Sequence, residues 1–484
     1  MAKSDQYDAI IVGAGVGGLV CGGYLAKAGC KVLLLEKHSQ PGGCCSSFQR
    51  QGYLFDVGPH YLGSLRPGGI LRNILRDLEI EGRIEFLTND LTDRIITPDK
   101  EIHIYKNQEK TQEEFIRHFP AEHRGINNFF RTLLSLDISR GLVANSPAQT
   151  FAQVLDQYFS DPKLKAVFSV FLGNIGLPPS QASGFIPLIV LREFILDGGY
   201  YPAGGMRALP NALVKCFQKN GGTILYRKNV KEIILQNQTA QGVAVASGEK
   251  FFARFVVSGI DAGALFRDQI SEPTAERESV ERLKPSMSAV VLFLGLKSRL
   301  ADLPKHFTTW YFPTYDIEQC YRNQIHCDSR EEIPYLICTF PSLIDASLAP
   351  EGKNVLRVFV GARPGQDPGW QKNKKEITGR LLQKLKAMVP DILDLIEVKE
   401  IGTPDTFHRY TGNQNGSIFG WAALPDQTGR KVFPLRTSVE NLYLTGHWTT
   451  TGIGQSGVAT VAFAGKDAAQ MIIGKNKRLT RRAR

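Results

Sequence analysis

The stretch from Tyr7 to Lys37 constrains the fold most, because it carries the complete pattern of a strand, a glycine-rich turn, a helix and a second strand. Ile10 to Val12 form a short apolar run of the kind that makes a buried parallel strand. The following turn has the spacing G-x-G-x-x-G, which is typical of dinucleotide binding when it joins a strand to a helix. The turn consists of Gly13, Ala14, Gly15, Val16, Gly17 and Gly18. A parallel α/β sheet that binds a nucleotide is therefore predicted.

Each glycine of this turn has a separate steric role. Gly13 permits the tight turn, Gly15 lets the backbone approach a pyrophosphate, and Gly18 lets the helix pack close to the strand. The N–H groups and the dipole of the helix N-terminus favour the phosphate anion. Glu36 ends the second strand about twenty residues on, where a carboxylate accepts hydrogen bonds from a ribose diol. This unit alone suits a nicotinamide and a flavin dinucleotide equally.

The charge of the chain bears on its partners. Its 484 residues carry a net charge of +11, and the last of them, Lys475 to Arg484, form a basic cluster. This cluster is too polar to pack, so it is predicted either to be a solvated, disordered tail or to be attracted to an anionic membrane surface, at about 1 kcal/mol per basic residue. The charge is not gathered with aromatic residues on a recognisable module, which argues against nucleic acid.

The cysteines and the apolar runs exclude several classes of protein. Eight cysteines without regular spacing predict reduced thiols in a cytosolic setting rather than a disulfide framework. The N-terminus lacks the apolar region of a secretory signal, and no uncharged run is long enough to span a bilayer, so any membrane contact is expected to be peripheral. No metal is predicted, because His, Cys and carboxylate residues show no metal-ligand spacing. No G-x-S-x-G motif suggests a serine hydrolase.

The middle of the chain changes its pattern. A second glycine turn at Pro41 to Gly43 is followed by a predicted hairpin around Gln51-Gly52. Residues 66–198 then carry apolar residues at helical spacing, which predicts a mostly helical insertion. Residues 284–401 mix predicted strands with one helix. Together these two segments are expected to form the inserted α+β substrate domain, with a helical part that faces the membrane.

The end of the chain repeats the logic of its beginning. A strand at Leu442 to Leu444 leads into a glycine turn and then into a helix of small residues from Val458 to Ile473. The nucleotide-binding domain is therefore predicted to be discontinuous. The expected division is 1–65, 199–283 and 402–474 for this domain, 66–198 and 284–401 for the substrate domain, and 475–484 for the basic tail.

Seven motifs together resemble the phytoene desaturase, carotenoid isomerase and retinol saturase group of FAD-dependent oxidoreductases. They are GAGVGGL at Gly13–Leu19, PGG at Pro41–Gly43, GYLFDVG at Gly52–Gly58, YPAGGM at Tyr201–Met206, VVSGIDA at Val256–Ala262, TPDTFHRYTGNQNGSIFGW at Thr403–Trp421 and LYLTGHWTTTGIGQSGV at Leu442–Val458. The resemblance spans nearly the whole chain. It implies FAD as the cofactor and a two-dinucleotide-binding-domain, Rossmann-like α/β fold with an inserted substrate domain.

The resemblance also implies roles for single residues. Glu36 would hold the adenosine ribose, Val230 would meet the adenine through its backbone, and the closing turn would line the pyrophosphate, ribityl chain and isoalloxazine. The expected FAD-binding residues are Gly13, Ala14, Gly15, Gly17, Gly18, Glu36, Lys37, Gly42, Gly43, Val230, Gly446, His447, Gly454, Gln455, Gly457 and Val458. His60, Tyr61 and His447 are the candidates for a catalytic role beside the flavin.

The chain departs from the group at three points. Thr451 precedes Gly452 where desaturases of the group carry a proline. His447 stands where many flavoproteins place an acidic residue, and the H-Y-x-G pattern at His60 is similar to that of retinol saturases.

The resemblance predicts desaturation or cis-trans isomerisation of a carotenoid-like or retinoid-like polyene, by hydride exchange with flavin N5. Such an isoprenoid offers almost no polar group, so its recognition must come from apolar area, at about 25 cal/mol per Å². The alternatives are a polyene saturase of the retinol saturase type, a flavin amine oxidase, and a non-catalytic prenyl-binding protein of the GDP-dissociation-inhibitor type. The expected location is the cytoplasm at a membrane surface, or a thylakoid surface in a photosynthetic source.

Overall fold

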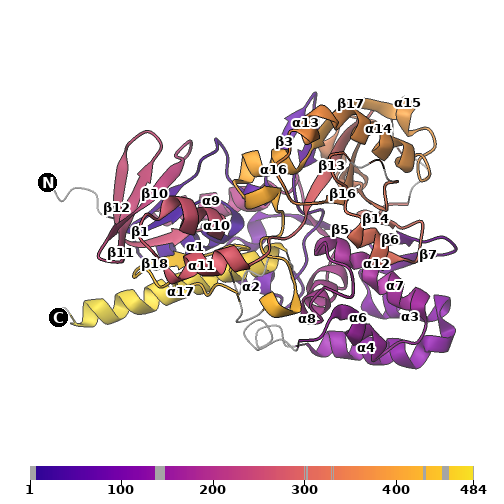
Figure 1. Ribbon diagram of the computed structural model, residues 1–484, viewed down its shortest axis with the longest axis horizontal. Coiled ribbons are helices and arrows are strands. Elements are labelled where there is room, and N and C mark those ends of the chain that lie inside the picture. The colour runs from indigo at the N-terminus through magenta and orange to yellow at the C-terminus, as the bar shows by residue number, and fades with distance from the viewer. Residues whose placement is uncertain are drawn as a thin grey trace.

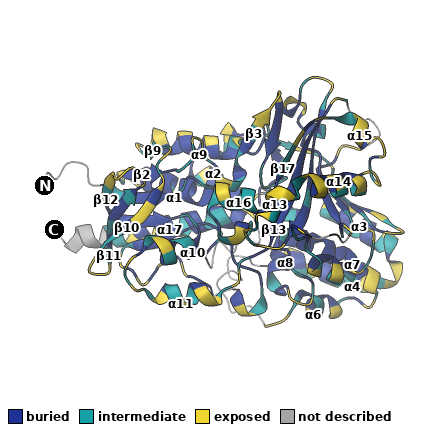
Figure 2. Cartoon of the chain, turned by 45° about the horizontal axis from the view of Figure 1, so that its top comes forward, coloured by how far each residue is buried: buried dark blue, intermediate teal, exposed yellow. Residues whose placement is uncertain are grey.

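The computed structural model describes residues 7–136, 148–298, 300, 304–328, 330, 332–428, 432–449 and 457–482. Two seven-stranded sheets lie side by side along the molecule, and each has its own covering helices (Figure 1). The strands at the centre of both sheets are buried, whereas the outer helices expose one face (Figure 2).

The first sheet has a parallel core built around the N-terminal strand. β1 (Tyr7–Val12) pairs in parallel with β2 (Val32–Leu35) on one side and with β12 (Lys250–Ser258) on the other. β9 (Thr223–Leu225) continues the core beyond β2, and β18 (Leu442–Leu444) continues it beyond β12. β10 (Val230–Gln236) and β11 (Thr239–Val245) form an antiparallel edge. The last strand of the chain thus joins the sheet that the first strand began.

Helices on both faces explain the unbroken apolar run of β1. Ala9 and Ile11 belong to the buried cluster on one face, while Ile10 and Val12 belong to the cluster on the other. The helices of the first face are α1 (Val16–Lys27), α9 (Ala208–Lys219) and α17 (Val458–Arg482), and those of the second are α10 (Ala262–Ala264) and α11 (Ala275–Arg282). A strand covered on both faces has no solvent side and needs no polar alternation.

Glycines allow α1 and α17 to pack at close range. A Cβ built on Gly465 of α17 would lie well under 3.0 Å from the carbonyl oxygen of Gly17 in α1. Only a residue without a side chain fits at this crossing. The first and last helices of the chain therefore lie against each other beside the same sheet.

The second sheet has the strand order β17-β13-β16-β15-β14-β6-β7. β13 (Ser288–Leu296), which pairs with β17 on one side and β16 on the other, is buried along its whole length. The other strands are β6 (Leu91–Ile96), β7 (Glu101–Tyr105), β14 (Thr308–Tyr311), β15 (Leu336–Thr339), β16 (Asn354–Ala362) and β17 (Ile396–Gly402). All neighbours are antiparallel except β14 and β6, which run in parallel. β13, β15 and β16 lie within residues 284–401, where the sequence predicts strands.

The prediction of a mostly helical segment from 66 to 198 overlooked β5 (Phe86–Thr88), β6 and β7. The polar residues Thr92 and Asp93 of β6 interrupt its apolar pattern, and the strand gains its parallel partner, β14, from a distant part of the chain. Helices make up the remainder: α2 (Ile70–Asp77), α3 (Gln108–His118), α4 (His123–Ser135), α6 (Phe151–Asp156), α7 (Pro162–Ser169) and α8 (Phe185–Val190). α8 continues into a π-helical turn, Leu191–Ile195.

The basic C-terminal segment is helical where a disordered tail was one expectation. α17 does not end at Ile473 but runs on to Arg482 and projects beyond the first sheet (Figure 1). Arg and Lys have good helix propensity, and a helix already formed extends easily by one residue at a time. Among the described residues, no helix combines the length and the apolar character needed to cross a membrane. All eight cysteines are free thiols, as predicted.

Candidate functional site

Two glycine turns meet at the carboxyl ends of β1 and β2. The amide of Gly42 donates to the carbonyl of Ala14 at 2.8 Å, and Gly42 forms a parallel bridge with Gly15. A Cβ on Gly43 would lie 3.3 Å from the Cα of Gly15. Gly13, Gly42 and Gly43 have φ angles of +98°, +121° and +55°, a region that side chains disfavour. The GAGVGG and PGG turns are thus in direct contact.

The closing turn reaches the same place from the other end of the chain. A Cβ on Gly17 would lie 2.9 Å from Thr445 Oγ1 and 3.0 Å from the amide nitrogen of Gly446. Gly446 has a φ of +89°, which turns the chain sharply after β18. Val458 begins α17 beyond this turn and Gly457 directly precedes it, whereas Gly454 and Gln455 lie outside the described residues. The first and last glycine turns therefore border one region.

The start of α1 fits a pyrophosphate. A Cβ on Gly15 would meet no atom within 4 Å, so the outer side of the turn is open. No side chain caps this helix end, and no acidic residue lies in the first turn. The backbone N–H groups and the positive end of the helix dipole therefore face the open side without a competing anion. Gly18 has the opposite environment, since a Cβ there would collide with the carbonyl oxygen of Gly13.

Glu36 is held in one orientation at the end of β2 by two backbone amides. Its side chain is buried, and its Oε2 accepts the amide of Ala14 at 2.8 Å while Oε1 accepts the amide of His38 at 2.9 Å. A carboxylate has about four acceptor positions, so both oxygens keep the capacity to accept hydroxyl groups. The carboxylate thus ties the glycine turn to the end of β2.

Two further residues expected at FAD are Lys37, which is half-buried, and Val230, which is buried. Burial lowers the pKa of Lys37, whose Nζ lies beside Gly412 at the end of α16 (Pro404–Thr411). Val230 begins β10 with its side chain buried, and its carbonyl accepts Nε2 of Gln269 at 3.3 Å.

A buried polar cluster lies next to the second glycine turn. A Cβ on Gly58 would lie well under 3.0 Å from the carbonyl oxygen of Cys44, so Gly58 packs directly on the PGG turn. The guanidinium of Arg357 in β16 donates to the carbonyls of Gly58 and Asp56, the latter at 3.3 Å. Arg357 and His60 line a cavity of about 10 Å³, which is room for about one water. Among the described atoms, Nε of Arg357 has no hydrogen-bond partner.

The Asp56 carboxylate anchors this cluster. It accepts Ser47 Oγ at 2.6 Å, the amide of Met206 at 3.0 Å and the hydroxyl of Tyr201. Burial raises the pKa of Asp56, although these donors and Arg357 act against the rise. Burial also lowers the pKa of Arg357 to about 10, which leaves it charged at neutral pH. A buried cation is thus held beside the Gly58 segment.

His60 is a neutral imidazole in this cluster. Its Nδ1 lies 2.5 Å from Thr308 Oγ1, and its ring lies 5.2 Å from the ring of Phe194 and 6.0 Å from that of Trp310. Burial and the charge of Arg357 lower the pKa of His60 to about 3. At neutral pH its ring can donate or accept a hydrogen bond but carries no charge.

Tyr61 lies behind His60 and is fully buried. Its hydroxyl donates to Asp93 Oδ2 at 2.9 Å, and its ring stacks on Phe194 at 4.4 Å. Trp310 Nε1 donates to the other oxygen of Asp93 at 2.7 Å. These two hydrogen bonds to Asp93 connect the His60 segment to β6 and β14, and they hold the Tyr61 side chain in the core.

His447 follows the Gly446 turn and belongs to a different group of side chains. Its Nε2 lies 3.4 Å from Asn413 Nδ2, and its ring lies 5.4 Å from that of Trp448. Burial lowers the pKa of His447 to about 4. A Cβ on Gly420 would lie well under 3.0 Å from the carbonyl oxygen of His447. His447 is therefore neutral and is attached to the segment after α16.

Arg357, Asp56 and Thr308 were not among the predicted site residues. Arg357 could have been noticed, because it is the only charged residue in the apolar strand Asn354–Ala362. A lone charge in a buried strand needs a partner and often has a function. Asp56 lies within a predicted motif, but nothing in the local sequence connects it to Tyr201 or Arg357.

The chain resembles a described family over nearly its full length. The family model for flavin containing amine oxidoreductases matches residues 16–473. All-trans-retinol 13,14-reductase of Danio rerio is 28% identical over 91% of this chain and 82% of its own length. Prolycopene isomerase of Daucus carota is also 28% identical, over 96% and 80%. The 4,4'-diapophytoene desaturase of Methylomonas is 26% identical over 97% and 95%.

Solved structures share the fold. An oxidoreductase from Methanosarcina mazei has a TM-score of 0.70 at 19% identity, over 96% of this chain and 99% of that one. Putrescine oxidase has a TM-score of 0.65 at 15% identity, over 97% and 99%. At these identities the likeness concerns the fold alone.

Proposed function

The chain belongs to the family of flavin containing amine oxidoreductases, and from this membership we propose that it is an FAD-dependent oxidoreductase acting on a carotenoid-like or retinoid-like polyene. The observation that carries the proposal is the convergence of three glycine turns. The Gly13–Gly18, Gly42–Gly43 and Gly446 turns border one region, which adjoins Gly58 and the His60 cluster. A dinucleotide with its pyrophosphate at the first turn would reach this cluster with its other end.

FAD rather than a nicotinamide dinucleotide suits this arrangement. A nicotinamide site needs the first glycine turn and the acidic residue, whereas here two further glycine turns approach the same region. The residues that would hold FAD are Glu36 at the ribose, Gly15 and Gly42 at the pyrophosphate, and Gly446 beyond it. When bound, FAD would supply the acceptor or donor of hydride, and the protein would provide binding and orientation.

The side chains at the end of the site away from the first glycine turn can orient a substrate without placing a charged group against it. His60 is neutral because its pKa is about 3, so it presents an uncharged ring to an apolar molecule. The positive charge of Arg357 is directed to backbone carbonyls rather than into the open. Hydrocarbon recognition then rests on apolar contact, at about 25 cal/mol per Å² buried.

The substrate class follows from the named relatives. The names of the three curated relatives refer to retinol, prolycopene and 4,4'-diapophytoene, all of them isoprenoid polyenes. Those names also differ in reaction type: reduction, isomerisation and desaturation. We therefore propose the substrate class and test the three reaction types together. A flavin amine oxidase is the second candidate, because putrescine oxidase shares the fold.

The test is expression of the chain in cells that make phytoene, prolycopene, all-trans lycopene or retinol, followed by chromatography of the extracted pigments. We expect cells with the wild type to convert one of these polyenes and cells with a Gly15→Ala control to convert none of them.

In a second experiment, the purified protein is mixed anaerobically with each polyene and with putrescine. Flavin bleaching by the amine alone would favour an amine oxidase. A protein that binds FAD but leaves every polyene unchanged would refute the substrate assignment.

A further inference from the structure

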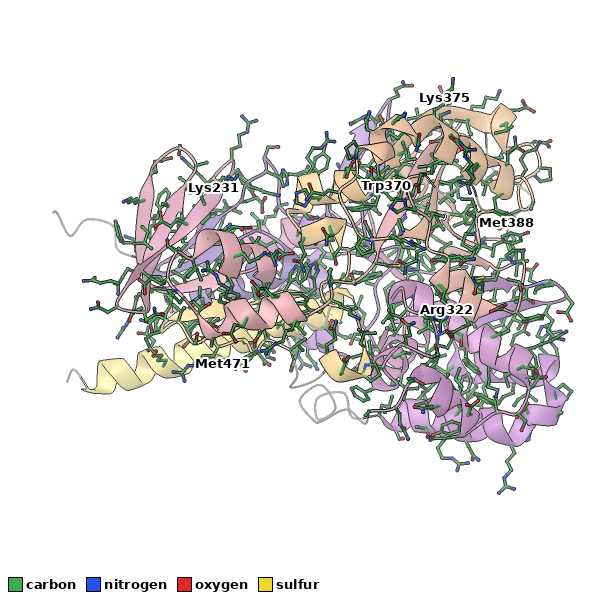
Figure 3. All side chains as sticks on the ribbon, in the orientation of Figure 1. Lys231, Arg322, Trp370, Lys375, Met388 and Met471 are labelled. Atoms are coloured by element: carbon green, nitrogen blue, oxygen red, sulfur yellow. The ribbon has the colours of Figure 1, made fainter. Side chains whose placement is uncertain are left out.

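A second cluster of reactive side chains lies in the helical cover of the second sheet. His326 and Cys327 follow α12 (Ile317–Arg322), and Asp367 precedes α13 (Gly369–Lys372). One ligand atom from each of the three lies within 4.8 Å of the others. Trp370, labelled in Figure 3, marks the place, since its ring centroid lies 6.2 Å from that of His326. The cluster brings an imidazole, a thiol and a carboxylate together from two separate segments.

The spacing of two of these atoms suits a tetrahedral metal ion. Cys327 Sγ lies 3.6 Å from His326 Nδ1. A zinc ion with a Zn–S bond of about 2.3 Å and a Zn–N bond of about 2.0–2.1 Å places its sulfur and nitrogen ligands about 3.6 Å apart at the tetrahedral angle. The protein therefore holds these two atoms at the separation that zinc requires.

The surroundings keep the cluster in place. Asn373 Nδ2 donates to the carbonyl of Cys327 at 2.7 Å, and the amide of Gly369 donates to Asp367 Oδ1 at 2.7 Å. A Cβ on Gly369 would lie 2.7 Å from Cys327 Sγ, so a glycine is needed beside the thiol. Cys327 is 4% exposed, whereas the side chain of His326 is 39% exposed. An ion can thus enter from the histidine side and reach a buried sulfur.

We propose that His326, Cys327 and Asp367 bind one Zn²⁺ ion, with water in the fourth position. Nitrogen, sulfur and carboxylate ligands together suit zinc, whereas magnesium and calcium prefer oxygen alone. On binding, the Cys327 thiol loses its proton to solvent as the sulfur–zinc bond forms. His326 Nδ1 binds through its neutral lone pair and gives up its 2.5 Å contact with Asp328. The site is separate from the glycine turns and does not depend on the proposed FAD chemistry.

The test uses the flavin-loaded protein after dialysis against a chelator. We expect calorimetric titration with ZnCl₂ to show one equivalent bound. Titration with Co²⁺ should give a thiolate charge-transfer band and visible bands on the long-wavelength side of the flavin. Cys327→Ala and Asp367→Asn should each weaken zinc binding by at least about 10- to 100-fold, the loss that even an outer-sphere change causes. The matched controls, Cys30→Ala and His123→Gln, should leave the affinity unchanged.

Either of two results in the zinc titrations would overturn the proposal. One is the absence of a zinc equivalent in the wild type, and the other is unchanged zinc affinity in both variants. Flavin absorbance and the unfolding midpoint verify that each variant is folded. If Cys327→Ala does not fold, Asp367→Asn decides, because asparagine keeps an oxygen for the amide of Gly369. Cobalt spectra without a thiolate band would also contradict the assigned sulfur ligand.

Discussion

The pair Gly15 and Gly18 offers the sharpest test of the dinucleotide site, because the two glycines have opposite surroundings within one turn. Gly15 has φ −67° and ψ 168°, which alanine adopts freely, and a Cβ there meets no atom within 4 Å. Gly18 would place its Cβ against the carbonyl oxygen of Gly13, well under 3.0 Å away. Alanine at Gly15 should therefore disturb only a ligand that approaches the turn from outside, whereas alanine at Gly18 should disturb the fold.

The magnitudes follow from these environments. At the helix N-cap, Gly15→Ala costs about 0.5–1 kcal/mol, and the lower entropy of the unfolded chain returns about 0.4–1 kcal/mol. The free energy of unfolding of the apoprotein should thus stay within about 1 kcal/mol of the wild type. Gly18→Ala forces a backbone collision and should cost about 3 kcal/mol or more. The methyl group on Gly15 would meet the pyrophosphate, so FAD affinity should fall at least about tenfold, or about 1.4 kcal/mol.

The assay combines urea unfolding of the apoproteins with FAD titration followed by the quenching of flavin fluorescence. We expect Gly15→Ala to affect the two measurements differently, with a normal free energy of unfolding and weak FAD binding. Gly18→Ala should lower both the free energy of unfolding and the FAD affinity. Wild-type FAD affinity in Gly15→Ala would refute the placement of the pyrophosphate at this turn. A large loss of apoprotein stability in that variant would refute the open environment on which the reasoning rests.

Three further predictions concern the buried polar side chains. Burial raises the pKa of Asp93 to about 6, so the folded state binds this proton more tightly than the unfolded state does. The contribution of Asp93 to the free energy of unfolding therefore falls by about 3 kcal/mol as pH rises from about 4 to 6. Asp93→Asn should remove that fall in urea titrations at several pH values. The pKa of His60 is lowered to about 3, so the free energy of unfolding instead decreases as pH falls below 6.5. His60→Gln should remove about 2 kcal/mol of this loss between pH 6.5 and 5. An unchanged dependence of stability on pH in this variant would contradict the buried, neutral imidazole. Arg357→Met should cost about 1–3 kcal/mol by leaving the buried carbonyls of Asp56 and Gly58 without their donor. Because the charge of Arg357 lowers the pKa of His60, NMR titration of this variant should show a higher pKa for His60, and a variant of wild-type stability would show that these hydrogen bonds are not needed.

Local sequence was sufficient wherever one short segment makes its own structure. The Tyr7–Lys37 unit was predicted as strand, turn, helix and strand, and β1, α1 and β2 occupy those positions. The hairpin around Gln51-Gly52 is also present, as β3 (Ser47–Arg50) and β4 (Tyr53–Asp56). In each case glycine and apolar spacing act over a few residues, so no distant contact is needed to specify the result.

The candidate site was predicted only in part, for the same reason. The glycines and Glu36 could be named because their spacing carries the chemistry. Arg357 stands out in the sequence as a lone charge in an apolar strand, but its partners could not be named, since these carbonyls come from the segment before His60 and the contact crosses some 300 residues of chain. The hydroxyl of Tyr61 likewise found its acceptor, Asp93, on a strand that the helical pattern of that region had hidden.

The expectation that no metal site exists rested on spacing along the chain. His326 and Cys327 are adjacent and Asp367 is distant, which matches no ligand pattern visible in a sequence. The fold brings them within 4.8 Å, and it is on this proximity that the zinc proposal depends.

The sequence by itself determined the family, the G-x-G-x-x-G turn after the first strand and the acidic residue at the end of the second, because these depend on glycines and carboxylates at fixed short separations. Tertiary structure decided which distant segments meet: Gly17 with Gly446, Gly15 with Gly42, and Arg357 with the residues before His60. The physical reason is that φ angles and helix starts are local properties, whereas buried charges and packed glycines acquire their meaning only from the atoms that folding places against them.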